Sequence, residues 1–282
     1  MRIQSERESE AVKQERSLLV FKRDDLIQKS RYSLTVQEQR IVLYAMSKIK
    51  PTDDAFQEYT FKLRHFMKLC GLKTDSCTEL KRILINLESK TWYMETAPNV
   101  ESSVSWFRKV RINKKEGTIS VRFDDDMMPY LLQLTQQNDF YTQICLLYLL
   151  PMKSKYGIRL YEILKSYNKN NREWFFEIDK LKERIDATQA CYSNFSNFKK
   201  KCLDPAVNEI NAYTDINVAY VPEYEGRKVT RIRFFMATKA KEDLLGTRLG
   251  VIKELDGEIN YSEFFENIED DVRTQFFRDN PR

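Results

Sequence analysis

The chain has 282 residues, enough for two ordinary domains, and 42% of them are hydrophobic, which excludes a disordered chain and allows packed cores. Its net charge of +5 hides an asymmetry, because residues 241–282 hold 11 acidic and 6 basic residues and residues 1–240 therefore carry +10. A basic body favours a polyanionic partner such as nucleic acid, although charge alone determines neither a fold nor a function.

Several classes of enzyme are disfavoured by what the sequence lacks. His65 is its single histidine, so it cannot form the histidine cluster of a metal-dependent nicking enzyme. Neither a GxxxxGK[ST] nor a GxGxxG loop occurs, so no phosphate-binding loop for a nucleotide is expected. The five cysteines form no C-x-x-C pair, which predicts reduced core thiols. We expect no enzymatic activity and no cofactor or metal.

Neither a targeting segment nor a membrane-spanning segment is expected. The first 16 residues are densely charged and lack the apolar core of a signal peptide. The longest apolar stretch, Phe140–Leu150, is about half of the ~20 residues that a membrane-spanning helix needs. We therefore expect a cytoplasmic protein with no membrane contact.

The first predicted elements are a helix, a strand and a short helix. Thr35 and Glu38 have the spacing of a capping box, and apolar residues then keep helical spacing over 35–49. Residues 58–64 alternate between apolar and polar side chains, which predicts a half-buried strand, and a short helix over 66–70 follows.

Another helix and a long hairpin complete this first unit. Ser76 and Glu79 form a second capping-box pattern, followed by one apolar helical stripe. A strand over 91–95 precedes the hairpin, whose strands are expected over 104–112 and 119–123. The order helix, strand, helix, turn, helix, hairpin is that of a winged helix.

Residues 124–152 are expected to form two helices that join this unit to the next. The acids Asp124, Asp125 and Asp126 stand before an apolar helical run, so they either bind a divalent ion or cap the helix and complement its dipole. We expect the second role.

The same order of elements then recurs. A helix is expected over 156–167, a strand over 174–178 and a short helix capped by Asp179. A turn leads to a helix over 194–203 that continues past Pro205, and a hairpin closes the unit with strands over 216–221 and 229–236.

The repeated order predicts an α+β protein with two tandem winged-helix domains, each a helix-turn-helix followed by a β-hairpin wing. A likeness between Ile41–Tyr44 and Ile158–Tyr161 supports a duplication. The expected organisation is a charged flexible N-terminus over 1–16, a first winged-helix domain over 17–135, a second over 136–240 and an acidic tail over 241–282.

A helix that reads the major groove carries basic or amide side chains away from its apolar stripe. The predicted helix 194–203 does so at Asn194, Asn197, Lys199, Lys200 and Lys201. Asparagine can pair with adenine and lysine with guanine, which favours base recognition. The alternative is that the lysines only solvate an exposed face.

Further candidates for DNA contact lie on the equivalent helix of the first unit and on both wings. Basic residues on a wing usually neutralise phosphates, which adds affinity but little sequence information. These candidates are Thr78, Lys81 and Arg82 on the helix, Arg108, Lys109, Lys114 and Lys115 on the first wing, and Arg227, Lys228 and Arg231 on the second wing.

The segment Tyr192–Asn211 resembles the Rep initiators of iteron-containing plasmids. That family carries a similar Phe-Lys-Lys/Arg-x-x-Leu-x-Pro-Ala-x-x-Glu-Ile-Asn run in its second winged helix. Residues 33–41 and Tyr59–Phe61 resemble the opening of its first unit, and the resemblance spans about residues 17–238.

The resemblance implies a double-stranded DNA-binding protein that binds directly repeated origin sites (iterons), helps to open an AT-rich segment and recruits host replication proteins such as a helicase or an initiator. It also implies a homodimer, formed through the first unit and in equilibrium with the monomer, that represses its own gene. It places Lys199, Lys200, Lys201, Arg227 and Lys228 at the DNA.

Two alternatives remain open. One is a winged-helix transcription repressor without an initiator role, which would protect a single palindrome in a footprint where an initiator protects several repeats. The other is a nicking enzyme that uses one of the 15 tyrosines, although the missing histidine cluster disfavours it.

Overall fold

The computed structural model describes residues 18–50, 53–70, 77–97, 100–113, 115–134, 140–168 and 172–256. The predicted flexible N-terminus over 1–16 and residues 257–282 of the predicted acidic tail lie outside this part of the chain. The described chain begins with elements that the sequence patterns did not predict, namely β1 (Leu19–Arg23), α2 (Asp24–Lys29) and β2 (Arg31–Tyr32).

The first winged-helix unit runs from α3 to β7. Thr35 caps α3 as predicted, because its side chain accepts a hydrogen bond from the backbone N–H of Glu38 while the Glu38 carboxylate accepts one from Thr35. The sheet order is β3-β7-β6. The elements are α3 (Val36–Met46), β3 (Tyr59–Lys62), α4 (Leu63–Leu69), α5 (Cys77–Glu88), β6 (Phe107–Asn113) and β7 (Thr118–Phe123).

The predicted single strand over 104–112 is wrong. Its first part belongs to β5 (Val100–Ser105), which pairs with β4 (Thr91–Ala97) in a separate sheet of order β2-β4-β5. The break falls where Trp106 and Phe107 are both buried, at 2% exposure each, so two successive side chains point inward and the period of two is lost. The wing is therefore the shorter β6–β7 hairpin.

The two helices predicted over 124–152 are also largely absent. The described residues of this stretch, 124–134 and 140–152, hold only the short helices η2 (Asp125–Met127), α6 (Met128–Leu131) and α7 (Leu146–Leu149), together with the strand β8 (Tyr141–Cys145). Strand β8 pairs antiparallel with β1. Side chains of β8 alternate between half-buried and buried, but the strand is short and runs into an apolar stretch, and so short a run does not reveal by its periodicity whether it is strand or helix.

The second winged-helix unit runs from α8 to β11, with the sheet order β10-β11-β9. Asp179 does not cap α9 as predicted, because the N-cap residue is Glu177 and Asp179 lies in the first turn. The elements are α8 (Lys155–Tyr167), β9 (Glu173–Glu177), α9 (Ile178–Arg184), η3 (Ala190–Tyr192), α10 (Phe195–Phe198), the π-helical turn η4 (Lys199–Leu203), α11 (Asp204–Tyr213), β10 (Ile216–Glu225) and β11 (Lys228–Thr238).

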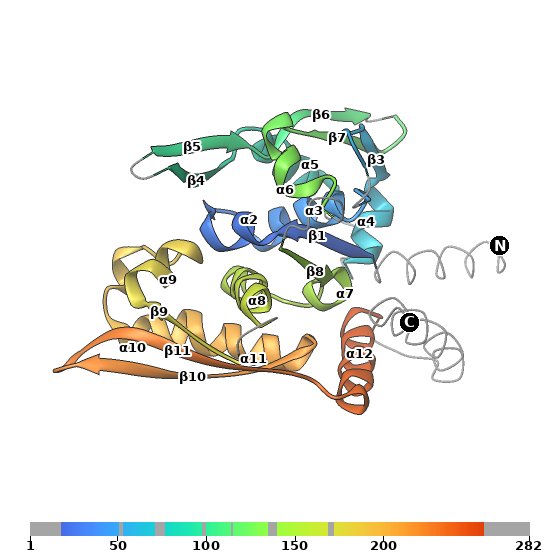
Figure 1. Cartoon of the computed structure of the whole chain (residues 1–282). Helices are drawn as coiled ribbons and strands as arrows, with labels where there is room; N and C mark the ends of the chain where they lie inside the picture. The colour runs from blue at the N-terminus through green and yellow to red at the C-terminus, as the bar shows by residue number, and fades with distance from the viewer. Residues whose placement is uncertain are drawn as a thin grey trace.

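The two units correspond element by element, since β3, β6 and β7 of the first sheet occupy the places of β9, β10 and β11 in the second. This confirms the predicted α+β fold of two tandem winged helices. Each wing turns at a glycine with positive φ, Gly117 at 64° and Gly226 at 62°, a conformation that glycine adopts without strain. The two wing tips lie at opposite ends of the molecule (Figure 1).

A last helix, α12 (Lys241–Asp256), forms the beginning of the predicted tail and packs against α11 and α7. Val251 is fully buried there, and the Arg248 side chain donates a hydrogen bond to the Tyr148 hydroxyl at 3.3 Å. The buried residues of both units form one continuous cluster. Among the described residues, no helix is long and apolar enough to cross a membrane.

Candidate nucleic-acid interface

The helix that follows the second turn is continuous from Phe195 to Tyr213 and changes its winding once, at the π-helical turn η4. Pro205 is the second residue of α11, two positions after this turn. A proline inside an α-helix lacks an N–H and clashes with the carbonyl four residues earlier, and a wider turn there accommodates both effects. We call α10, η4 and α11 together the reading helix.

Asn194 and Asn197 are exposed at the start of the reading helix, but both side chains already have local partners. The Asn194 side chain caps the helix by accepting a hydrogen bond from the Ser196 N–H at 2.8 Å. The Asn197 amide donates one to the Cys191 carbonyl at 3.2 Å. With α-helical spacing Asn194, Asn197 and Lys201 would share one face, but η4 interrupts that spacing.

The three lysines of η4 are all exposed but differ in their neighbours. Lys199 forms an ion pair with Asp204 at 2.8 Å and lies 5.9 Å from the centre of the Tyr220 ring. Lys200 and Lys201 have no acidic partner in the described part of the chain. These two charges are therefore available to a phosphate or a base.

The second wing extends beyond its sheet. Strand β9 pairs only with Arg231–Phe235 of β11, so the tip around Gly226 is a two-stranded ribbon. Arg227 and Lys228 are exposed at this tip and form no ion pair with any described residue. Arg231, by contrast, pairs with Glu223 at 3.0 Å.

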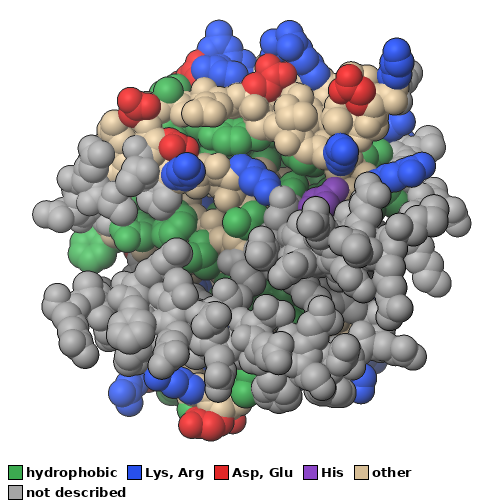
Figure 2. Space-filling model, turned by 90° about the vertical axis from the view of Figure 1, so that its right-hand side faces the viewer, with side chains coloured by type: hydrophobic (Ala, Val, Ile, Leu, Met, Phe, Trp, Pro, Cys, Tyr) green, Lys and Arg blue, Asp and Glu red, His purple; other side chains and the backbone are tan. Residues whose placement is uncertain are grey.

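The candidates of the first unit are less free than those of the second. Arg108 pairs with Asp125, and Lys109 lies 4.0 Å from Glu58. Lys115 is exposed and has no ionic partner within the described ranges. Figure 2 shows Lys and Arg side chains over this unit, at the top of the molecule, interspersed with acidic ones.

The remaining candidates of the first unit lie on or beside α5 and the wing tip. Lys81 is half-buried and Arg82 is exposed. Thr78 is placed in α5, but its side chain lies outside the described part, as does the whole of Lys114. On the second unit, four candidates are exposed and have no ionic partner among the described residues, namely Lys200, Lys201, Arg227 and Lys228.

Sequence reasoning missed the aromatic side chains around the reading helix. The Tyr156 hydroxyl of α8 donates a hydrogen bond to the Tyr192 hydroxyl at 3.2 Å, just before the helix. Tyr224 is 62% exposed, two residues before the glycine of the wing tip. The signal for it in the sequence is an aromatic residue beside a basic turn.

Tyr220 of β10 joins the second wing to the reading helix, because its hydroxyl donates to the Asp204 carboxylate at 2.5 Å. Burial raises the pKa of Asp204, but the hydrogen bonds from Lys199 and Tyr220 outweigh it, so that the pKa is lowered overall. Asp204 is therefore held as an anion between helix and wing.

The Glu-Ile-Asn end of the family-like run has a structural role. The Glu209 carboxylate accepts hydrogen bonds from the backbone N–H groups of Lys153 and Ser154, at 2.9 and 3.0 Å, and so ties α11 to the start of α8. The Asn211 side chain exchanges two hydrogen bonds with the backbone of Val218 in β10. These residues fix the fold rather than face a groove.

The remaining chemistry of the described part is limited. No group of three or more His, Cys, Asp or Glu residues there could hold a metal ion. Asp124 accepts a hydrogen bond from the Asp126 N–H and caps η2, which agrees with the predicted helix-terminus role. Cys70, Cys145 and Cys202 are buried thiols as predicted, but Cys191 is exposed and is not a core residue.

Comparison with known families matches both units. Residues 19–165 match the first domain of the initiator replication proteins, described as "Initiator Replication protein, WH1", and residues 177–236 match the second, "Initiator Rep protein, WH2". The chain belongs to the Rep initiator family. The predicted resemblance is thereby confirmed over most of the length.

This Rep protein is also similar to one curated protein and to one solved structure. It is 28% identical over 132 residues to the PI protein of Escherichia coli, an alignment that covers 42% of this chain and 43% of that relative. The chain thus spans less than half of the curated relative it matches. Its fold is similar to that in a crystal structure of the Pi initiator protein in complex with iteron DNA, with a TM-score of 0.65, 19% identity and coverage of 80% of this chain and 99% of that one.

Proposed function

We propose that this Rep protein is a sequence-specific double-stranded DNA-binding initiator of plasmid replication that binds repeated origin sites. The observation that carries the proposal is the placement of Lys200, Lys201, Arg227 and Lys228, which are exposed without ionic partners among the described residues, on the reading helix and wing of the second unit. The family match and the likeness to an initiator seen with iteron DNA support it.

The partners follow from the same proposal. The protein would help to open the origin, recruit host replication proteins such as a helicase or an initiator, and repress its own gene as a homodimer in equilibrium with the monomer. It would act in the cytoplasm on plasmid DNA, without enzymatic activity and without a cofactor.

A footprint tests the proposal. The purified protein is titrated onto the DNA that flanks its own gene, and DNase I protection is mapped. We expect several directly repeated protected sites of equal length, because an initiator loads as several monomers on tandem repeats. A single protected palindrome would instead support the repressor, and the absence of any specific protection would contradict both.

The same DNA also tests the expected lack of enzymatic activity. Supercoiled plasmid carrying the protected region is incubated with the protein and Mg²⁺. We expect no relaxed product and no protein attached to a 5′ end. A covalent adduct would support a nicking enzyme that uses a tyrosine.

A further inference from the structure

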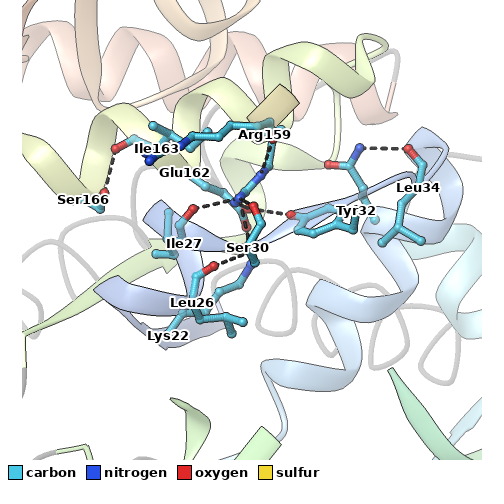
Figure 3. A network of polar contacts seen from close by, with 12 residues as sticks. Lys22, Leu26, Ile27, Ser30, Tyr32, Leu34, Arg159, Glu162, Ile163 and Ser166 are labelled. Carbon is cyan, nitrogen blue, oxygen red and sulfur yellow. Dashed lines mark hydrogen bonds and ion pairs between the residues drawn. The ribbon is translucent and has the colours of Figure 1, made fainter. Parts of the chain in front are cut away.

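One buried guanidinium connects the N-terminal segment to the helix-turn-helix of the second unit (Figure 3). Arg159 of α8 is 3% exposed. Its Nη2 donates to the carbonyls of Ile27 and Ser30, both at 2.7 Å, and its Nε donates to the carbonyl of Arg184 at 3.1 Å. Arg184 ends α9, the helix that precedes the reading helix.

A buried carboxylate one turn further along α8 continues this connection. Glu162 accepts a hydrogen bond from the Lys22 ammonium of β1 at 2.5 Å and from the Tyr32 hydroxyl of β2 at 3.1 Å. Lys22 and Glu162 are almost wholly buried, with side-chain exposures of 4% and 1%. Burial lowers the pKa of Lys22, and the charge of Glu162 opposes this.

The third part lies at the turn before the reading helix. Asp186 adopts a positive φ of 59°, directly after α9. Its carboxylate accepts hydrogen bonds from the Ser33 hydroxyl at 2.8 Å and from the Lys155 ammonium at 2.5 Å. The chain that leads into the first unit is thus hydrogen-bonded to the turn of the second helix-turn-helix.

These contacts are costly to form and specific in geometry. Buried ion pairs add little net stability compared with apolar packing, because desolvation offsets the attraction, but removing one partner is strongly unfavourable. The arrangement of Arg159, with acceptors from two separate segments, can be satisfied in only one relative position of those segments. A non-directional apolar contact between the units would not need a guanidinium that donates hydrogen bonds to two segments at once.

We propose that Lys22, Arg159, Glu162 and Asp186 form a rigid joint that fixes the separation of the two winged-helix units, so that the protein accepts DNA contacts at one spacing only. The inference rests on the proposed function, since it assumes that both units touch one repeat. The residues of the joint are positioning residues, because they act through the two units and not on the DNA itself.

The test compares duplexes that carry one repeat from the footprint with duplexes that have two base pairs inserted at its centre. Each added pair moves one contact by about 3.4 Å along the axis and by about 35° around it. We expect the wild-type affinity to fall by at least ~100-fold on insertion, because one unit loses its base contacts.

Two variants remove different numbers of the hydrogen bonds that form the joint. Arg159→Lys keeps the charge but cannot span both sets of carbonyls. The double variant Ser33→Ala with Asp186→Asn is milder, since asparagine tolerates the positive φ of this position. We expect both to bind the normal repeat more weakly and to lose less than ~10-fold on insertion, because the units can adjust separately.

A matched control is Lys153→Met, which removes the exposed ion pair at 2.9 Å between Lys153, just before α8, and Glu254 of α12, and leaves the joint intact. It should keep the full insertion penalty. Variants are compared only after circular dichroism shows wild-type secondary structure. A folded joint variant with an unchanged insertion penalty would overturn the inference.

A measurement without DNA separates this inference from the proposed function. Spin labels are attached at Glu88→Cys on α5 and Asn208→Cys on α11, both exposed, with Cys77 and Cys191 changed to serine. We expect a narrow distance distribution that broadens in the joint variants and not in Lys153→Met. If no repeat is bound at all, the proposed function is wrong. The joint is then tested by the width of the distance distribution alone, and an unchanged width in the joint variants would contradict it.

Discussion

Lys200 and Lys201 differ from Lys199 in one respect that matters for DNA binding, because only Lys199 has an acidic partner among the described residues. We expect Lys200→Ala and Lys201→Ala each to weaken binding to the specific repeat by about 10-fold, as for the loss of one good base or phosphate contact. Fluorescence anisotropy with a labelled repeat measures the change.

Lys199→Ala is the matched control on the same turn. Its charge is already compensated by Asp204, so we expect a smaller loss of affinity. Equal losses for all three lysines would contradict the distinction between paired and free charges, and no loss in any folded variant would remove the reading helix from the interface.

The candidate residues were predictable from the sequence, whereas their local partners were not. The pair Lys199–Asp204 spans five positions, a separation that does not bring side chains together on an α-helix and arises here from η4. The amides of Asn194 and Asn197 were expected to face bases, but capping and a turn carbonyl use them. Whether a side chain is occupied by a local hydrogen bond or ion pair depends on the backbone geometry, which the spacing of residues in the sequence does not give.

At the level of elements, Glu209 and the reading-helix lysines lie in one family-like run but have different roles. Glu209→Ala leaves the N–H groups of Lys153 and Ser154 without their acceptor. We expect the free energy of unfolding to fall by about 1–3 kcal/mol. Urea denaturation followed by circular dichroism measures it.

The same variant should keep the wild-type affinity for the repeat under conditions where it is fully folded, while Lys200→Ala should keep the wild-type stability. This crossed pattern distinguishes the fold-forming part of the run from its DNA-contacting part. A Glu209→Ala protein of normal stability and reduced affinity would reverse the assignment.

Elements with a clear period were predicted well, and those without one were not. Helix α3 begins at the predicted cap Thr35. Helix α8 also begins at a side-chain cap, Ser154, which was not predicted. The strands β5 and β6 were mistaken for one strand because the inward face changes at Trp106, and β8 was missed because it is short and runs into an apolar stretch. Whether such a segment forms a strand, and where the strand ends, depends on pairing with a strand distant in the sequence, which the local pattern does not show.

At the scale of the whole molecule, the basic surface predicts a strong dependence on salt. Lys115, Lys200, Lys201, Arg227 and Lys228 are exposed without ionic partners in the described part of the chain. If they contact phosphates, the logarithm of the association constant should fall against the logarithm of salt concentration with a slope of about −4 or steeper.

Removing two of these charges provides the internal comparison. The double variant Arg227→Ala with Lys228→Ala should make the slope less negative by about 2, because two fewer phosphates are neutralised and fewer counterions are released on binding. Binding titrations between low and physiological salt measure both slopes. A flat response in the wild type would show that the basic body does not contact the backbone of the DNA.

The two units could be predicted from the sequence because the order of elements repeats, but the joint between the units could not. Lys22 and Glu162 are separated by 140 positions, and Arg159 and Glu162 lie within a helix whose pattern suggests only an amphipathic face. Nothing in a single sequence shows that these charges meet in the interior. The relative placement of the units is therefore information that only the folded chain contains.

The π-helical turn η4 has a consequence for how recognition can change over time. Such a turn is an α-helix with one extra residue taken up by a wider turn, so deleting a single residue there would restore regular winding and leave α10 and α11 nearly in phase. The core anchors at α11 would stay in place. The loss of one codon can thus remove one of the exposed lysines, Lys199, Lys200 or Lys201, without moving the elements on either side, so the charges of this turn can change while the fold stays the same.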